Sequence, residues 1–224
     1  MTFSIVARSA DARLFGMAIA SSSPAVAARC AHGRAGAGVV ASQNITDPSL
    51  GPKILRELAA GASAAAAVTR VLQSSPHADY RQVLAIGREG PPAVHSGRHA
   101  LGVVDVALGT DAAAAGNLLA NPGVPRAMVA AFEAADGHFA DRLLCALRAG
   151  AAQGGEAGPV HSAGLLVVRN VDWPLVDLRV DWADEDPIRA LTALWKLYAP
   201  QMEDYVRRAL DPAAAPSFGV PGNP

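Results

Sequence analysis

Hairpins and pairs of helices alternate along this chain, and this order restricts its fold more than any other feature. Residues 3–8 and 14–20 are rich in apolar residues and flank a short turn, which indicates a β-hairpin. Residues 48–73 change to the helical period, with a break at Gly61 and a helix cap at Ser63. The other expected elements are a strand over 33–42, a hairpin over 81–97, a strand over 100–108, helices over 123–135 and 138–152, strands over 161–169 and 174–182, and a final helix over 187–210.

Antiparallel hairpins followed by helices in pairs favour two sheets that pack face to face, with helices on both outer sides. The expected fold is therefore an α+β, four-layer αββα sandwich. A dinucleotide-binding fold is not supported, for two reasons. The glycines of residues 33–38 have the wrong spacing, and this segment does not connect a strand to a following helix. We expect one domain over residues 1–210, and a flexible Pro/Ala/Gly-rich tail over residues 211–224.

The charge balance argues against nucleic acid or a membrane surface as a partner, since 19 Lys and Arg residues face 20 Asp and Glu residues. No apolar stretch reaches the ~20 residues of a membrane span, and no basic leader opens the chain, so we expect a soluble, cytoplasmic protein. The six His residues and two Cys residues have no metal-site spacing. The sequence predicts neither a metal nor a cofactor.

Thr2 is the first candidate for a chemical role. Removal of the initiator Met is favoured by a small second residue, and it would leave Thr2 with a hydroxyl nucleophile and a free α-amine. An α-amine has an ordinary pKa of about 8 and can act as a base near neutral pH. The alternative is that Thr2 is a β-branched residue that merely opens a strand.

Seven segments in order resemble the bacterial and archaeal domain-of-unknown-function family 1028. They are "TFSIVAR", "GMAIAS", "GAGVVASQNITDPSLGPKILRELAAG", "AVHSG", "GNLLA", "SAGLLVV" and "VDLRVDWADEDPI", and they cover Thr2 to Ile188. The resemblance implies the N-terminal-nucleophile (Ntn) hydrolase superfamily and its αββα sandwich. It also places Thr2 at the nucleophile position. The segment 97–116 departs from the family, since Ala115 stands where Gln is usual, which puts a specificity role of this loop in doubt.

The resemblance also suggests groups around the nucleophile. Asn117, in "GNLLA", is the candidate donor to the oxyanion, and the alternative is an Asn that stabilises a turn before a helix. Ser22, Gln43 and Asn44 stand at the ends of two early strands, where they could orient the amine or a substrate. Ordinary capping of strand ends would explain these three residues nearly as well.

Two further candidates lie later in the chain. His95 ends a strand and could contact a substrate, although a lone His is more often structural. Alternation in "VDLRVD" puts Asp177, Arg179 and Asp181 on one face of a strand. Asp177 could hold the α-amine and Arg179 a substrate carboxylate, or the three could pair with one another.

Together these features predict an Ntn-type amidohydrolase that acts on a small amide, lactam, ureide or peptide-like substrate through Thr2. One alternative is a non-catalytic binding or assembly module on the same fold. Another is a non-hydrolytic, cyclohydrolase-type ring chemistry that does not use the terminal amine. The Ala-rich helix face at residues 62–68 permits close packing between subunits, and we expect a homo-oligomer, most simply a dimer.

Overall fold

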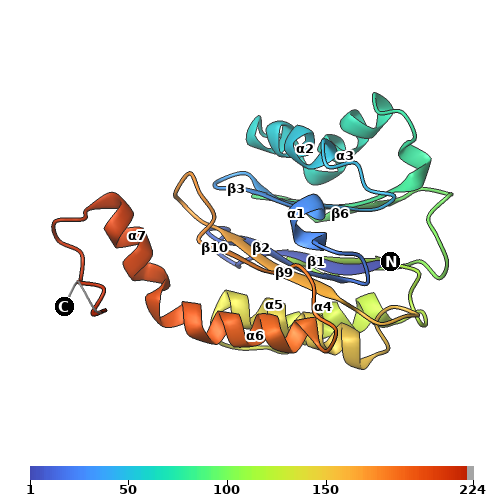
Figure 1. Ribbon diagram of the computed structural model, residues 1–224. Coiled ribbons are helices and arrows are strands. Elements are labelled where there is room, and N and C mark those ends of the chain that lie inside the picture. The colour runs from blue at the N-terminus through green and yellow to red at the C-terminus, as the bar shows by residue number, and fades with distance from the viewer. Residues whose placement is uncertain (221–224) are drawn as a thin grey trace.

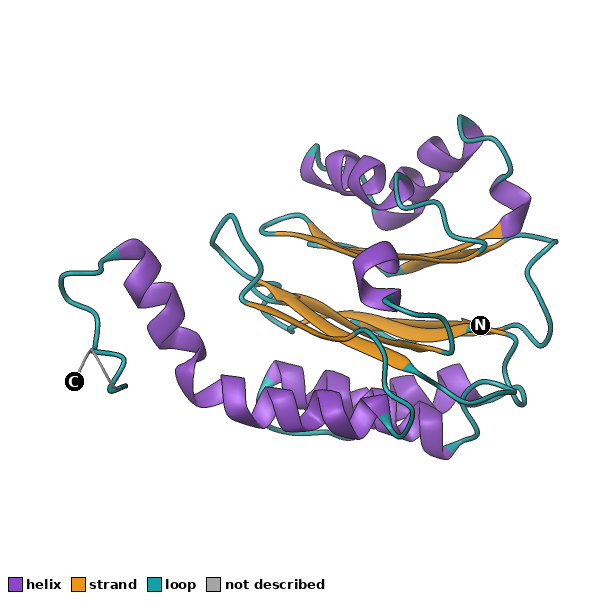
Figure 2. Ribbon diagram, viewed as in Figure 1, coloured by secondary structure: helices purple, strands orange, loops and turns teal. Residues whose placement is uncertain are grey.

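Four layers make up the molecule, in the order helices, sheet, sheet, helices (Figures 1 and 2). The computed structural model describes residues 1–220. A 6-stranded sheet has the order β10-β9-β2-β1-β8-β7, and a 4-stranded sheet has the order β3-β4-β5-β6. All pairings in both sheets are antiparallel. The α+β, αββα sandwich expected from the sequence is thereby confirmed.

The strands of the larger sheet are β1 (Thr2–Arg8), β2 (Phe15–Ser21), β7 (Asp105–Leu108), β8 (Ala112–Asn117), β9 (Ser162–Val168) and β10 (Val176–Val180). Those of the smaller sheet are β3 (Ala31–Arg34), β4 (Gly38–Asn44), β5 (Arg81–Gly87) and β6 (Ala93–Ser96). The helices are α1 (Val26–Cys30), α2 (Leu50–Ala59), α3 (Ala64–Gln73), α4 (Val124–Ala134), α5 (Phe139–Ala152), α6 (Pro187–Tyr198) and α7 (Met202–Leu210), with short 3₁₀ turns at Ala78–Tyr80 and Ala199–Gln201.

Most local signals in the sequence produce the expected elements. Ser63 caps α3 by accepting a hydrogen bond from the Ala66 backbone N–H at 3.3 Å, and Pro200 lies in the 3₁₀ turn that separates α6 from α7. Three strands differ from expectation, and the one expected over residues 100–108 begins only at Asp105. Residues 31–34 form their own strand, which turns back at Gly36 (φ 70°) into β4. The alanine-rich β8 is the largest difference, because it follows no strand pattern and is held by pairing with β1 and β7.

β1 is one of the two central strands of the larger sheet, and it presents the N-terminal residues to the space between the sheets. Its odd-numbered residues Phe3 and Ile5 pack into the core beneath α4 and α5. The opposite face turns toward the smaller sheet, where Val6 joins the apolar core between the sheets. Thr2 and Ser4 share this face with Val6, so the alternation along β1 carries both hydroxyls into the same space.

The space between the sheets is apolar in its middle and polar at the end where β1 begins. Its middle is apolar and includes Phe15, Met17 and Ile86, all fully buried. At the end where β1 begins, the buried side chains are instead polar. They are Thr2, Ser4, Gln43, Gln82 and Asn117.

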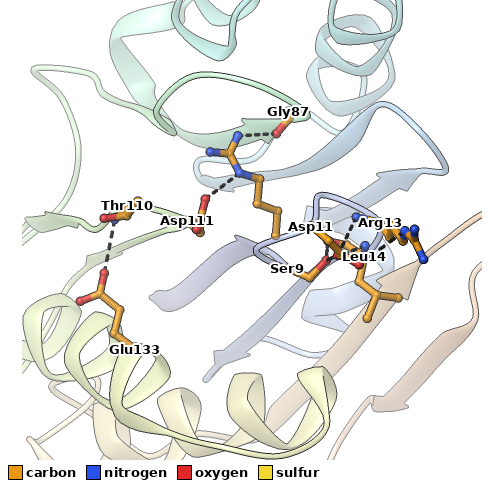
Figure 3. A network of polar contacts seen from close by, with 9 residues as sticks. Ser9, Asp11, Arg13, Leu14, Gly87, Thr110, Asp111 and Glu133 are labelled. Carbon is orange, nitrogen blue, oxygen red and sulfur yellow. Dashed lines mark hydrogen bonds and ion pairs between the residues drawn. The ribbon is translucent and has the colours of Figure 1, made fainter.

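A second polar contact joins the sheets at the far end of β1 (Figure 3). The Arg8 Nε lies 2.7 Å from the Asp111 Oδ1, and Arg8 also donates to the Gly87 carbonyl of the smaller sheet at 3.0 Å. The Arg8 side chain is 13% exposed, so this ion pair is shielded from water more than a surface pair is.

The C-terminal part extends beyond the layers, and α7 projects from the body of the molecule (Figure 1). Residues 211–220 return along this helix, where Arg208 donates to the Pro216 and Ser217 carbonyls and lies 4.0 Å from the centre of the Phe218 ring. The rest of the expected tail, residues 221–224, lies outside the described residues. Within residues 1–220, no helix has the length and apolar character needed to cross a bilayer.

We predict that Arg8→Leu lowers the free energy of unfolding by about 1–3 kcal/mol, because it leaves Asp111 and the Gly87 carbonyl without their donor. Arg13→Leu is the matched control, since Arg13 pairs with Asp11 at 3.5 Å and is 83% exposed (Figure 3). It should change stability by less than about 0.5 kcal/mol. Urea denaturation of the three proteins measures both values, and equal stabilities of the two variants would contradict the prediction.

Candidate active site

Thr2 is the first residue of β1 and lies at the polar end of the space between the sheets. It is 5% exposed and is paired with Asn117 of β8. The Thr2 Oγ1 donates to the Met1 carbonyl oxygen and lies 3.4 Å from the Ser21 Oγ at the end of β2. A threonine hydroxyl thus lies beside a peptide carbonyl and a second hydroxyl, in a position shielded from solvent.

Ser21 is the serine of "ASSS" that enters this arrangement through its side chain. It is fully buried, its Oγ donates to the Met1 carbonyl, and the same Oγ accepts from the Ser23 backbone N–H at 3.1 Å. Ser162 holds the turn in place, because its Oγ donates to the Ser23 carbonyl at 2.6 Å. The expected residue Ser22 takes part through its backbone N–H.

Two buried glutamines of the smaller sheet reach across to β8. The Gln43 Nε2 donates to the Ala115 carbonyl at 3.2 Å, and the Gln82 Nε2 donates to the Gly116 carbonyl at 3.1 Å. Because both nitrogens face carbonyls, the oxygen of each amide must point the other way. The Gln43 Oε1 accordingly accepts from the Ser4 Oγ at 2.7 Å, and the Gln82 Oε1 accepts from the Gln43 Nε2 at 2.8 Å.

This arrangement fixes the orientation of Asn117. Since the Gln82 Oε1 is an acceptor, the group of Asn117 that faces it at 3.0 Å is the Nδ2 donor. The Asn117 Oδ1 is then left buried with no hydrogen-bond partner among residues 1–220. An unpaired buried acceptor costs free energy, so a donor that it could bind is favoured here. The oxyanion-donor role expected for Asn117 stays a prediction, which depends on the second Nδ2 hydrogen.

Glu156 is a buried carboxylate that the sequence did not single out. Residues 155–157 pair with the segment after β8, through hydrogen bonds from Ala120 N to Gly155 O and from Ala157 N to Leu118 O. Glu156 is 4% exposed, and each of its carboxylate oxygens lies 3.1 Å from the Ser22 backbone N–H.

The charge of Glu156 depends on its neighbours. Burial is the largest influence on this carboxyl, and the net result of all influences is a pKa raised from 4.5 to about 7. The positive chain amino group at Met1, the hydrogen bonds from Ser22 and the His161 ring act in the opposite direction and lower the pKa. The His161 ring itself is stacked on Trp182, with centroids 4.3 Å apart.

Asn44 and His95 are placed apart from Thr2. Asn44 has φ 71°, donates to the Tyr80 carbonyl at 2.6 Å and accepts from the Leu101 N–H at 3.2 Å, so it joins loops at the end of β4. His95 lies on the β6 edge strand, and its Nε2 is 3.1 Å from the Ala78 carbonyl. Neither side chain has a hydrogen bond to the groups around Thr2.

Asp177 and Arg179 lie on β10, which β9 and β2 separate from β1. They form a two-pronged ion pair with each other, at 2.8 and 2.7 Å. Both line a separate hollow of about 440 Å³ between β3, α2 and β10, together with Arg34 and Arg56. The structure therefore does not bring this pair together with Thr2.

Gln82 and Glu156 were not predicted from the sequence, and they differ in how clearly the sequence marks them. Gln82 follows the same alternation as Leu84 and Ile86, so a polar residue on an apolar face could have marked it. Glu156 stands in a glycine-rich loop without periodicity, and only the fold brings it to β2. Among residues 1–220, no group of three or more His, Cys, Asp or Glu residues could hold a metal ion.

Comparisons with known proteins add one family and a few solved structures. The model of a family described as "Family of unknown function (DUF1028)" matches residues 2–191. A crystal structure of protein SPO2555 from Silicibacter pomeroyi, described with the same family, is similar at 31% identity. Its alignment covers 92% of this chain and 90% of that chain, with a TM-score of 0.85. A search of curated proteins finds no match.

Two more distant solved structures are also similar. Anbu (ancestral beta-subunit) from Yersinia bercovieri shares 11% identity, with 91% of this chain and 97% of that chain covered and a TM-score of 0.45. Eukaryotic HslV from Trypanosoma brucei shares 12% identity, with 76% of this chain and 100% of that chain covered and a TM-score of 0.42.

We predict that Glu156 makes stability depend on pH. Its pKa is higher in the folded protein than the ordinary 4.5, so the folded state holds the proton more tightly than the unfolded state does between pH 4.5 and about 7. Relative to Glu156→Gln, the native chain should therefore lose stability as pH rises through this window, by an amount on the order of 2 kcal/mol.

Urea denaturation at several pH values, with Met1 present, measures this difference. Glu185→Gln is the control, because Glu185 is 84% exposed and pairs only with Arg189 among the described residues. That variant should keep the pH dependence of the native chain. Parallel stability curves for the native chain and Glu156→Gln would show that Glu156 does not titrate in this range.

Proposed function

Since the chain belongs to the DUF1028 family, we propose that it is an Ntn-type amidohydrolase that cleaves a small amide, lactam, ureide or peptide-like substrate. The observation that carries the proposal is the environment of Thr2. Its hydroxyl is buried at the start of β1, beside the Met1 carbonyl group and the Ser21 hydroxyl.

Loss of Met1 prepares the nucleophile in the proposed mechanism. The Thr2 α-amine, with an ordinary pKa of about 8, becomes free and takes the proton of the Thr2 hydroxyl directly or through a water. The Oγ1 then bonds to the substrate carbonyl carbon. As the C–N bond breaks, the same amine returns the proton to the leaving nitrogen, and an ester on Thr2 remains. Water then adds to this ester, so that the acid is released and the hydroxyl is restored.

The negative oxygen of the tetrahedral intermediate needs donors. Ser21 is one candidate, because its Oγ already donates to a carbonyl oxygen beside Thr2. Asn117 is the other, through the Nδ2 hydrogen that Gln82 does not use. One such donor is worth ~2.7–4 kcal/mol of barrier. The unpartnered Asn117 Oδ1 suits a further role, as an acceptor for the Thr2 amine across the strand pair.

The other expected residues take supporting roles in this proposal. Gln43 holds Gln82 and so orients Asn117, and the Ser22 backbone N–H holds Glu156. Asn44, His95, Asp177 and Arg179 stay as predictions for substrate contact beyond the immediate site. Self-association also stays a proposal, and the projecting α7, with exposed Tyr205 and Leu210, is a surface where a second copy could pack.

We predict that hydrolysis requires both groups of Thr2. A chain that begins at Thr2, checked by intact mass, should release ammonia or amine from a panel of amides and lactams. Thr2→Ser should keep part of this activity, because a hydroxyl and an amine remain. Thr2→Ala, or a chain with a residue retained before Thr2, should lose about 10³-fold or more. Melting curves test whether each variant is folded.

Other outcomes would favour other functions. Turnover that survives a blocked amine would favour ring chemistry that does not use the terminal amine. A folded chain with a free Thr2 that turns over no substrate would favour a binding or assembly module.

We predict that Asn117→Ala lowers kcat by about 10²–10³-fold and leaves KM nearly unchanged, because the amide acts on the charged groups of the reaction. Gln82 would keep its bond to Gln43, so the fold should tolerate the change. Asn170→Ala, at an exposed asparagine after β9, is the control and should behave as the native chain. An unchanged kcat in Asn117→Ala would remove Asn117 from the proposed mechanism.

A further inference from the structure

Met1 occupies the candidate site as an acyl group would. Its carbonyl oxygen accepts hydrogen bonds from the Thr2 Oγ1 and the Ser21 Oγ. The first of these hydroxyls is the proposed nucleophile, and the second is a proposed donor to the oxyanion. The Met1 carbonyl oxygen therefore marks a position at which both hydroxyls can donate to a carbonyl group.

The amino group of Met1 lies within electrostatic range of the buried carboxyl group of Glu156. β1 and β2 are antiparallel, and Phe3 lies opposite Ala20. Continued by two residues toward the N-terminus, this register places Met1 opposite Ser22. The Ser22 backbone N–H donates to Glu156, so the carboxyl group is held by the residue that lies opposite Met1. The positive charge of the chain amino group stabilises the ionised form of Glu156.

A loop of small residues borders the Met1 side chain. A Cβ added at Gly158 would lie 3.6 Å from the Met1 Cε and 3.9 Å from its Sδ. This glycine follows Glu156 by two residues, so one loop provides both the carboxylate and the wall beside the side chain. Met1 thus has separate surroundings for its carbonyl, its ammonium group and its side chain.

Removal of Met1 takes away the group that contacts the two hydroxyls and the loop at Gly158 and that lies near Glu156. When the Met1 amino group leaves, a carboxyl group that is only 4% exposed is unfavourable in its ionised form, so it either takes up a proton or pairs with another cation. We propose that the space held by Met1 is the acyl subsite, and that Glu156 there binds the α-ammonium group of an amino acid amide or of the free N-terminus of a short peptide. This inference rests on the proposed hydrolase function, and it names the substrate class.

The test compares two amides that differ in the ammonium group alone. L-methioninamide and its deamino analogue, 4-(methylthio)butanamide, are given to the chain that begins at Thr2, and kcat/KM is obtained from ammonia release. We expect a preference of about 10- to 100-fold for L-methioninamide, as is typical of a charge-assisted hydrogen bond. Glu156→Gln should bring the ratio close to one, and Glu185→Gln should leave it unchanged.

The glutamine variant keeps an acceptor for the Ser22 N–H, and its melting curve shows whether it is folded. A preference that survives in folded Glu156→Gln would overturn the subsite. An equal loss on both amides would do so as well, because it would assign Glu156 to the Thr2 amine and not to the substrate.

Binding separates this inference from the hydrolase proposal. Calorimetry measures L-methioninamide binding to Thr2→Ala, which lacks the nucleophile, and to Thr2→Ala with Glu156→Gln. Binding to Thr2→Ala but not to the double variant would support the subsite, even if the native chain hydrolyses nothing. Hydrolysis of both amides at equal rates would support the hydrolase and overturn the subsite. The absence of both binding and hydrolysis would overturn both.

Discussion

The hydrogen-bonding demand of two glutamines buried between the sheets sets the geometry on which the candidate site depends. Gln43 and Gln82 are fully buried, and each donates to a carbonyl of β8. A buried amide must be paired, so these bonds hold the smaller sheet against the alanine-rich β8 and fix its register beside β1. Asn117 has no freedom to flip within this network, and its unpartnered oxygen follows from bonds made by Gln82.

Polar and apolar residues are also segregated along β1. Val6 packs into the apolar middle of the space between the sheets, and Arg8 closes the far end through Asp111 and Gly87. With both ends of β1 held by polar bonds across the sheets, Thr2 is a strand residue, not a loose terminus. Preorganisation of this kind is what a nucleophile needs, because groups fixed before the reaction need no reorganisation during it.

The sequence allowed the four-layer fold to be predicted because its hairpins and helix pairs carry strong local signals. It did not predict β8, since a run of four alanines has no strand preference and forms a strand only through its partners on both sides. Thr2, Gln43 and Asn117 could be expected near one another from the resemblance and the strand ends. Glu156 could not, because it is placed by a loop pairing with residues 118–120 that no local pattern encodes. Conversely, Asp177 and Arg179 share a strand face but lie across two strands from β1.

Glu156 links the proposed chemistry to the proposed substrate through electrostatics. A carboxylate near an amine stabilises the charged amine and raises its pKa, which weakens the amine as a base. The Thr2 amine must be neutral to accept a proton from its own hydroxyl. In the proposed complex, the ammonium group of the substrate pairs with Glu156 and cancels this charge, so Glu156 no longer favours the charged form of the Thr2 amine. The substrate would then promote formation of the neutral amine that activates the Thr2 hydroxyl, and a substrate without the ammonium group would not.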